Sequence, residues 1–156
     1  MRSPIAKEGF IFVIPLAFLA ATFYSFSYYW VAGLFEGLFL FCAWFFRDPE
    51  RNIPQEPNLI VSPADGKVVE IIKESDSLLP NENYTRVSVF LNVFNVHVNR
   101  VPIAGKIQAV RYNKGKFLNA ASHKASLDNE QNAILLDNGS SKILVKQIAG
   151  LIARRI

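Results

Sequence analysis

This sequence has little cysteine and histidine, and both scarcities exclude classes of function. Its single cysteine, Cys42, allows neither an intrachain disulfide nor a multi-cysteine metal site. Its two histidines, His97 and His123, lie far apart and belong to no His-Glu motif, so we expect no bound metal. The sequence also has no glycine-rich phosphate loop, which leaves nucleotide chemistry without support.

Charge is thinly spread along the chain. The sequence has 17 Lys and Arg against 13 Asp and Glu, a net charge of +4. Basic and acidic residues alternate, and no basic run is interleaved with aromatic residues, so nucleic acid is not an expected partner. The small surplus is typical of a solvated surface, and anionic membrane lipid is the partner class that it would otherwise favour.

Two long apolar stretches dominate the first third of the chain. Residues 9–26 contain no charged side chain, and residues 28–46 contain only Glu36. As helices they would each be about 27–29 Å long, close to the ~30 Å hydrocarbon core of a bilayer. We therefore expect a membrane-associated helical hairpin over residues 1–46, which either spans the bilayer or dips into one leaflet. Glu36 would be a functional carboxylate or one neutralised by pairing or protonation.

The basic residues that flank these stretches predict an orientation. Arg2 and Lys7 precede the first stretch, and Arg47 and Arg51 follow the second. The positive-inside rule then places both ends of the hairpin, and the domain that follows, on the cytoplasmic side of the cell membrane. Residues 47–57 contain three prolines and little apolar content, which predicts an extended linker.

The remainder of the chain contains short runs rich in valine and isoleucine, bounded by turn residues, which are typical of β-strands. Two Gly-containing turns, Asp65-Gly66 and Asn138-Gly139, supply the positive φ angles that tight connections need. We predict a mainly β, small barrel or sandwich-like domain over residues 58–156, and residues 117–129 as one helical turn or a loop. The expected strands are residues 59–61, 67–72, 86–93, 96–101, 106–112, 133–136 and 142–148.

Asp65 and His97 are the candidate catalytic residues in this domain. A histidine oriented by an aspartate moves protons at neutral pH, whereas alone each would be an ordinary turn aspartate or strand histidine. The second histidine, His123, lies in a polar stretch and has the character of a loop residue. Ser140 follows Gly139 but lies in an expected hairpin turn. A further alternative is a membrane-tethered hydrolase with Ser88 or Ser122 as its nucleophile, but neither serine lies in a nucleophile elbow.

Several motifs, taken in order along the whole chain, resemble those of a known family. They follow the double apolar stretch and comprise residues 45–51 (FFRDPER), 63–66 (PADG), 94–102 (FNVHVNRVP), 128–132 (DNEQN) and 147–156 (QIAGLIARRI). The chain resembles the short form of phosphatidylserine decarboxylase proenzymes. The resemblance implies a carboxy-lyase that converts phosphatidylserine to phosphatidylethanolamine through a covalent pyruvoyl group, made from a serine by self-cleavage.

The resemblance also implies roles for single residues. Asp65 would orient His97, and His97 would act as base in self-cleavage and exchange a proton near the pyruvoyl during decarboxylation. Many relatives carry a second histidine where this chain has Arg100. With Arg100 at this position, either His97 alone serves both self-cleavage and decarboxylation, or Arg100 binds the phosphate or carboxylate of the lipid. Arg100 and His123 are the candidate substrate-binding side chains.

In the family, the Gly-Ser cleavage motif follows a segment like residues 147–156. The resemblance thus implies that the pyruvoyl serine lies beyond Ile156, and that this larger N-terminal part is inactive alone. Its implied partners are the lipid bilayer, phosphatidylserine and the small pyruvoyl-bearing C-terminal chain, and a homo-oligomer is compatible with the sequence. The alternative is a membrane-anchored, non-catalytic binding module or inactive paralogue.

Overall fold

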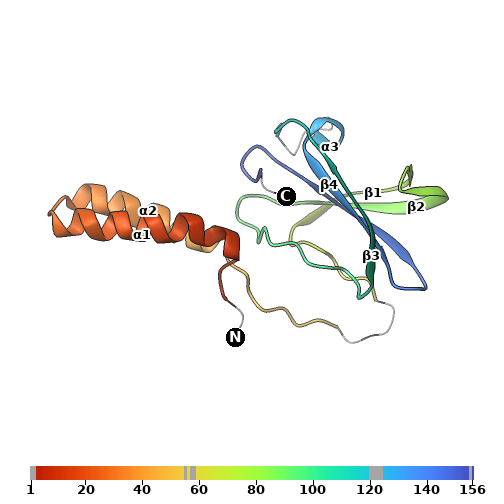
Figure 1. Cartoon of the computed structure of the whole chain (residues 1–156), viewed down its shortest axis with the longest axis horizontal. Helices are drawn as coiled ribbons and strands as arrows, with labels where there is room; N and C mark the ends of the chain where they lie inside the picture. Colours follow the sequence, from red (N-terminus) through yellow and green to blue (C-terminus); the bar gives the residue numbers. More distant parts are fainter. Residues whose placement is uncertain (1–2, 55, 57–58, 120–124, 155) are drawn as a thin grey trace. The chain divides into compact units, whose positions relative to one another are not determined.

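A computed structural model of the chain describes residues 3–54, 56, 59–119, 125–154 and 156. Two compact units make up the structure (Figure 1). The helical unit consists of Met1–Gln55 together with Val93–Val98. The strand unit consists of Glu56–Asn92 together with Asn99–Ile156.

The helical unit is built on an antiparallel hairpin of two apolar helices. A short 3-10 helix, η1 (Lys7–Gly9), leads into α1 (Phe10–Ser25), and α2 (Tyr29–Phe45) returns beside it. The reversal uses Ser27 at φ 61°. The N-terminal helical hairpin of the predicted fold class is therefore confirmed.

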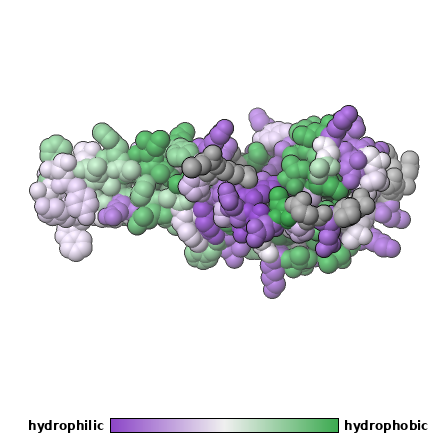
Figure 2. Space-filling model, turned by 90° about the horizontal axis from the view of Figure 1, so that it is seen from below, coloured by the Kyte–Doolittle hydropathy of each residue, from purple (hydrophilic) through white to green (hydrophobic). Residues whose placement is uncertain are grey.

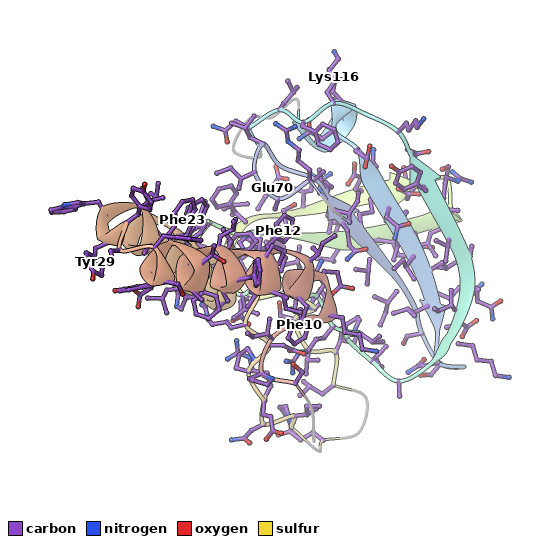
Figure 3. All side chains as sticks on the ribbon, turned by 60° about the vertical axis from the view of Figure 1, so that its left-hand side comes forward. Phe10, Phe12, Phe23, Tyr29, Glu70 and Lys116 are labelled. Carbon is purple, nitrogen blue, oxygen red and sulfur yellow. The ribbon has the colours of Figure 1, made fainter. Side chains whose placement is uncertain are left out.

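Both helices of the hairpin carry many exposed apolar side chains. Figure 3 shows Phe10, Phe12 and Phe23 along α1, and Figure 2 shows hydrophobic atoms over much of the helical face in view. Phe18 is 71% exposed, although it lies in the middle of α1. A helix that is apolar all round is covered by protein or by lipid, and little protein covers this one.

The two ends of the hairpin meet at its base. The Ala6 amide donates to the Phe46 carbonyl at 2.8 Å, and the Asp48 amide donates to the Pro4 carbonyl at 2.7 Å. A Cβ atom on Gly9 would come within 2.5 Å of the Phe46 Cβ, so the glycine allows this close approach. The residues that immediately follow α2 are thereby fixed against the start of the chain.

Two antiparallel sheets form the strand unit. The first pairs β1 (Lys67–Asp76) with β2 (Leu79–Phe90), and the second has the order β3 (Lys106–Asn113), β4 (Gln131–Asp137), β5 (Lys142–Ile148). The central strand β4 is the most buried, because it is paired on both sides. A single helical turn, α3 (Ala125–Asp128), precedes it, in agreement with the helical turn or loop that we predicted there.

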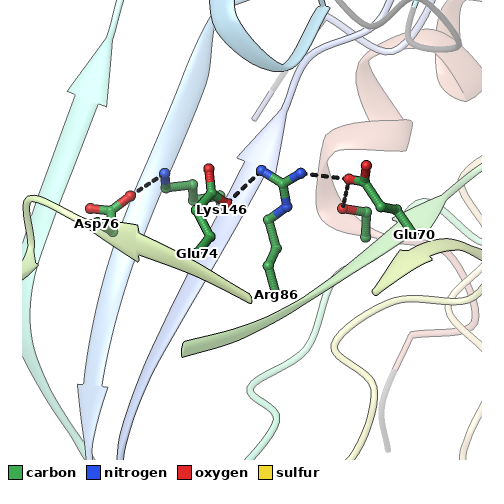
Figure 4. Close-up of polar contacts among 6 residues, drawn as sticks. Glu70, Glu74, Asp76, Arg86 and Lys146 are labelled. Atoms are coloured by element: carbon green, nitrogen blue, oxygen red, sulfur yellow. Dashed lines mark hydrogen bonds and ion pairs between the residues drawn. The ribbon is translucent and has the colours of Figure 1, made fainter. Parts of the chain in front are cut away.

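Polar contacts join the two sheets at the end of the β1–β2 hairpin (Figure 4). Lys146 on β5 forms an ion pair with Asp76, and Arg111 on β3 donates to the Ser77 hydroxyl at 2.9 Å. Burial raises the pKa of Asp76, but the Leu78 amide and the two cations outweigh it and hold that pKa below its usual value. Figure 4 also shows Arg86 of β2 paired with two glutamates of β1, Glu70 and Glu74.

The fold class is as predicted: mainly strands, in a sandwich-like domain, after a helical hairpin. Within the described ranges the sheets stay separate and close no barrel. Two of the expected strands are wrong, because residues 59–61 and 96–101 form no strand. Pro63 and Pro102 lie beside these segments and lack the amide hydrogen that a continuous ladder requires.

Candidate active site

Asp65 lies in a tight turn that leads into β1. The Ser62 hydroxyl donates to the Ala64 carbonyl at 2.7 Å, which closes the turn on its N-terminal side. Gly66 follows with φ +149°, and a Cβ there would come within 2.4 Å of the Phe90 carbonyl oxygen. A side chain at this position would clash with the partner strand. Asp65 is half-buried, and its backbone thus lies next to the start of β1 in the first sheet.

The segment that carries Arg100 runs beside this turn. The Arg100 amide donates to the Pro63 carbonyl at 2.8 Å, and the Val61 amide donates to the Pro102 carbonyl at 3.0 Å. These two bonds bring together the two motifs that the sequence singled out, although they are far apart in the chain. Arg100 is half-buried, and the strand unit therefore holds an aspartate and an arginine on adjoining backbone segments.

His97 belongs to the helical unit, where it packs on the end of α2. Its imidazole stacks on the Phe45 ring, with 4.4 Å between centroids and 24° between planes. Its Nδ1 atom lies 3.0 Å from the Asn95 carbonyl oxygen. Because a carbonyl only accepts hydrogen bonds, this contact assigns the proton of the neutral ring to Nδ1 and leaves the Nε2 lone pair to act as a base.

The surroundings of His97 favour its neutral form. Burial lowers the pKa of the imidazole, the Asn95 carbonyl raises it and the positive charge of Arg47 lowers it, and the net result is a pKa below the usual value. At neutral pH the ring is then available as a proton acceptor.

Arg47 fastens the His97 segment to the hairpin. Its guanidinium donates to the Trp44 carbonyl through one terminal nitrogen and to the Phe94 carbonyl through the other, both at 2.9 Å. The same group lies 4.2 Å over the Trp44 ring, and the Trp44 and Phe94 rings are 5.8 Å apart. The motif at residues 45–51 points to this region, but nothing in its spacing shows that it holds His97.

The predicted site residues fall into different parts of the structure. Asp65 and Arg100 are described in the strand unit and His97 in the helical unit, so the pairing of Asp65 with His97 stays a prediction. His123 lies outside the described residues. Ser140 occupies the β4–β5 turn, where its amide bonds to the Asn138 side chain at 3.1 Å, as the turn prediction requires.

Known proteins resemble this chain over nearly its full length. A sequence profile of the family described as phosphatidylserine decarboxylase matches residues 38–156. Proteins named phosphatidylserine decarboxylase proenzyme are similar to it: one from Syntrophotalea carbinolica is 49% identical over 99% of this chain and 73% of its own length. One from Syntrophus aciditrophicus is 49% identical over 97% and 72%, and one from Ruegeria pomeroyi is 48% identical over 98% and 71%. Identity of this level over most of both sequences, together with the profile match, shows that the chain is a member of the phosphatidylserine decarboxylase family.

Proposed function

We propose that this chain provides the larger part of an enzyme that decarboxylates phosphatidylserine to phosphatidylethanolamine. The observation that carries the proposal is the state of His97: a neutral imidazole with Nδ1 bonded to a carbonyl and Nε2 available to exchange a proton. Decarboxylation leaves a carbanion that must be protonated. Nε2 of His97 would first accept a proton from water and would then donate that proton to the carbanion, which returns the imidazole to its neutral form. Family membership supplies the substrate class, since the relatives are named for phosphatidylserine.

Asp65 and Arg100 complete the proposed constellation. The carboxylate of Asp65 would orient the imidazole of His97 and stabilise its protonated form during the reaction. The guanidinium of Arg100, held beside the Asp65 turn by the backbone bond to Pro63, would bind the phosphate or the carboxylate of the lipid headgroup. His123 would assist in substrate binding.

The reaction also needs an electron-poor carbonyl, which a covalent pyruvoyl group would supply as the acceptor of the electrons released with carbon dioxide. The residues of this chain fit such a group: His97 offers a base, and Arg100 a cation for an anionic substrate. The relatives are named proenzymes and are longer than the part matched here. We infer that the serine which becomes the pyruvoyl lies outside residues 1–156, on a small C-terminal chain, and that residues 1–156 alone are inactive.

The hairpin would attach the enzyme to its lipid substrate. Residues Lys7–Ser25 form one helix of 19 residues with mean hydropathy 1.6, long and apolar enough to cross a membrane. We propose that residues 1–46 anchor the protein in the cell membrane, that residues 47–57 link the anchor to the domain, and that residues 58–156 form the catalytic domain on the cytoplasmic side. The substrate then reaches the site from the bilayer itself.

The test joins residues 1–156 to the C-terminal remainder of the Syntrophotalea carbinolica relative. This completed chain is placed in nanodiscs with carboxyl-labelled phosphatidylserine, and released carbon dioxide is measured. We expect self-cleavage and decarboxylation from the completed chain, and from its Ser140→Ala control, because Ser140 is a turn residue. Release of no carbon dioxide by a folded, cleaved protein would contradict the proposal and support a non-catalytic binding module.

A further inference from the structure

Four aromatic rings, Phe41, Trp44, Phe45 and the following Phe46, form a platform at the end of α2, and His97 stacks on the Phe45 ring. The Phe45 ring contacts its helix neighbours Phe41 and Phe46, with ring centroids 6.1 and 5.1 Å away. These neighbours limit the rotation of Phe45. The imidazole of His97 stacks on the same Phe45 ring, with 4.4 Å between centroids.

The segment that carries His97 depends on side-chain contacts for its position. Residues 93–98 form no strand or helix, so no ladder of backbone bonds fixes them. Val96 is buried at 5% exposure, but Phe94 is 69% exposed. The bond from Arg47 to the Phe94 carbonyl and the stack on Phe45 are therefore two specific contacts that set the direction of the imidazole.

We propose that Phe45 is a positioning residue that sets the orientation of His97, and that Arg47 holds the segment against it. The inference rests on the proposed function, in which His97 exchanges the proton. Stacking engages the face of the imidazole and leaves the ring edge, which carries both nitrogens, able to form hydrogen bonds. With Nδ1 bonded to Asn95, the platform aims Nε2 in one direction.

The platform also affects the charge state of the ring. The stack contributes to the burial of His97, and Arg47 places a positive charge beside it. Both disfavour the imidazolium form. Loss of the Phe45 ring should therefore free the imidazole to rotate and move its pKa toward the ordinary value of about 6.5.

Histidine NMR tests this in residues 1–156 reconstituted in lipid nanodiscs. The chain has two histidines, and a His123→Asn variant assigns the signal of His97. We expect Phe45→Leu to remove the ring-current shift of the His97 protons and raise its pKa. Phe45→Tyr, which keeps the aromatic face, should restore both.

A matched control separates positioning from general damage to the hairpin. Phe35 lies on the same helix and stacks on Phe23 at 5.4 Å rather than on a histidine. Phe35→Leu should leave the His97 signal unchanged. If Phe45→Leu and Phe35→Leu give the same His97 spectrum, the positioning role is overturned.

A second variant addresses the contact made by Arg47. Arg47→Lys keeps the positive charge but loses the two-pronged link between the Trp44 and Phe94 carbonyls. We expect the His97 signal to lose its ring-current shift, whereas Arg51→Lys, in the exposed segment after α2, should not change it. An unchanged spectrum in Arg47→Lys would show that the two-pronged link has no positioning role.

Activity of the completed chain distinguishes this inference from the proposed function. We expect Phe45→Leu to lower kcat at least tenfold with little change in KM, and Phe45→Tyr to recover it. If Phe45→Leu shifts the His97 signal while His97→Asn keeps full activity, positioning stands and the proposed role of His97 fails. If His97→Asn is inactive but Phe45→Leu matches Phe35→Leu, positioning fails alone.

Discussion

Asn129 shows how one buried polar residue ties distant backbone segments together. Its side chain is 1% exposed and accepts a bond from the Leu118 amide at 2.9 Å. It donates to the carbonyls of Leu118 and Ala149 at 2.9 and 2.8 Å. The segment that precedes α3 and the segment that follows β5 are thus held by the same amide group.

Replacement of Asn129 by alanine should lower the stability of the strand unit. The change leaves buried backbone groups without partners, at a cost of about 2–3 kcal/mol. Denaturant unfolding monitored by circular dichroism measures it. Asn132→Ala, which removes a half-buried side-chain bond to Gln147 at 3.3 Å, is the control and should cost less than about 1 kcal/mol. Equal losses would contradict a special role for Asn129.

The titration of His97 gives a second prediction at the residue scale. Because its folded pKa is depressed, the unfolded chain binds more protons once the pH falls below the unfolded pKa of about 6.5. The native packing of His97 should therefore lose stability as the pH drops below that value. NMR titration should give a midpoint below 6.5, and a midpoint at or above 6.5 would refute the assigned environment.

At the scale of elements, two glycine turns differ in what they require. Gly66 has φ +149° and a close partner strand, whereas Gly139 has φ +91° and open space, with nothing within 4 Å of the point that a Cβ atom would occupy. The turn at Gly66 therefore requires both a positive φ angle and the absence of a Cβ atom next to the partner strand. The turn at Gly139 requires only the positive φ angle.

Alanine at these two positions should accordingly have unequal effects. Gly139→Ala should cost about 1 kcal/mol of strain, and Gly66→Ala about 2–3 kcal/mol because the clash with Phe90 adds to the strain. Thermal unfolding of the two variants provides the comparison. If Gly66→Ala is the milder change, the close approach of the Asp65 turn to β2 is incorrect.

The sequence is sufficient to predict elements whose signals are local. Unbroken apolar stretches predict both helices, and short apolar runs predict the strands β1 to β5. β1 extends beyond residue 72 to Asp76, because cross-strand pairing accommodates polar residues that resemble a turn in isolation. Residues 59–61 are apolar, and valines alternate with polar residues through most of residues 96–101. Both patterns are typical of strands, but neighbouring prolines prevent a regular ladder.

The candidate site is only partly predictable from the sequence, because only some of its features depend on residues that are adjacent in the chain. The Asp65-Gly66 turn is a property of adjacent residues, and its positive φ is expected from them. The stack of His97 on Phe45 joins residues that are far apart in sequence. No periodicity or spacing encodes such a contact, so the sequence alone identifies the motif at residues 45–51 without explaining it.

At the scale of the whole molecule, the proposed membrane attachment through the hairpin would bring the enzyme to its substrate. Phe18→Arg would place a charge in the middle of α1, at a cost of about 2.5–3.5 kcal/mol in a bilayer. We expect this variant to lose resistance to carbonate extraction from membranes. Trp30→Arg is the control, since Trp30 is 95% exposed at the start of α2 and would lie at the headgroup level. Extraction of both variants to the same extent would contradict the proposed anchor.

The central claim is that this chain supplies the proton-transferring histidine of a phosphatidylserine decarboxylase. The most direct measurement is the rate of carbon dioxide release from phosphatidylserine by the completed chain and by its His97→Asn variant, with self-cleavage of each verified by mass spectrometry. The account predicts that the variant either fails to self-cleave, because His97 is also the implied base of that step, or is at least about 100-fold slower once cleaved, in the range of a lost general acid or base. A cleaved His97→Asn protein with the rate of the unaltered chain would contradict it.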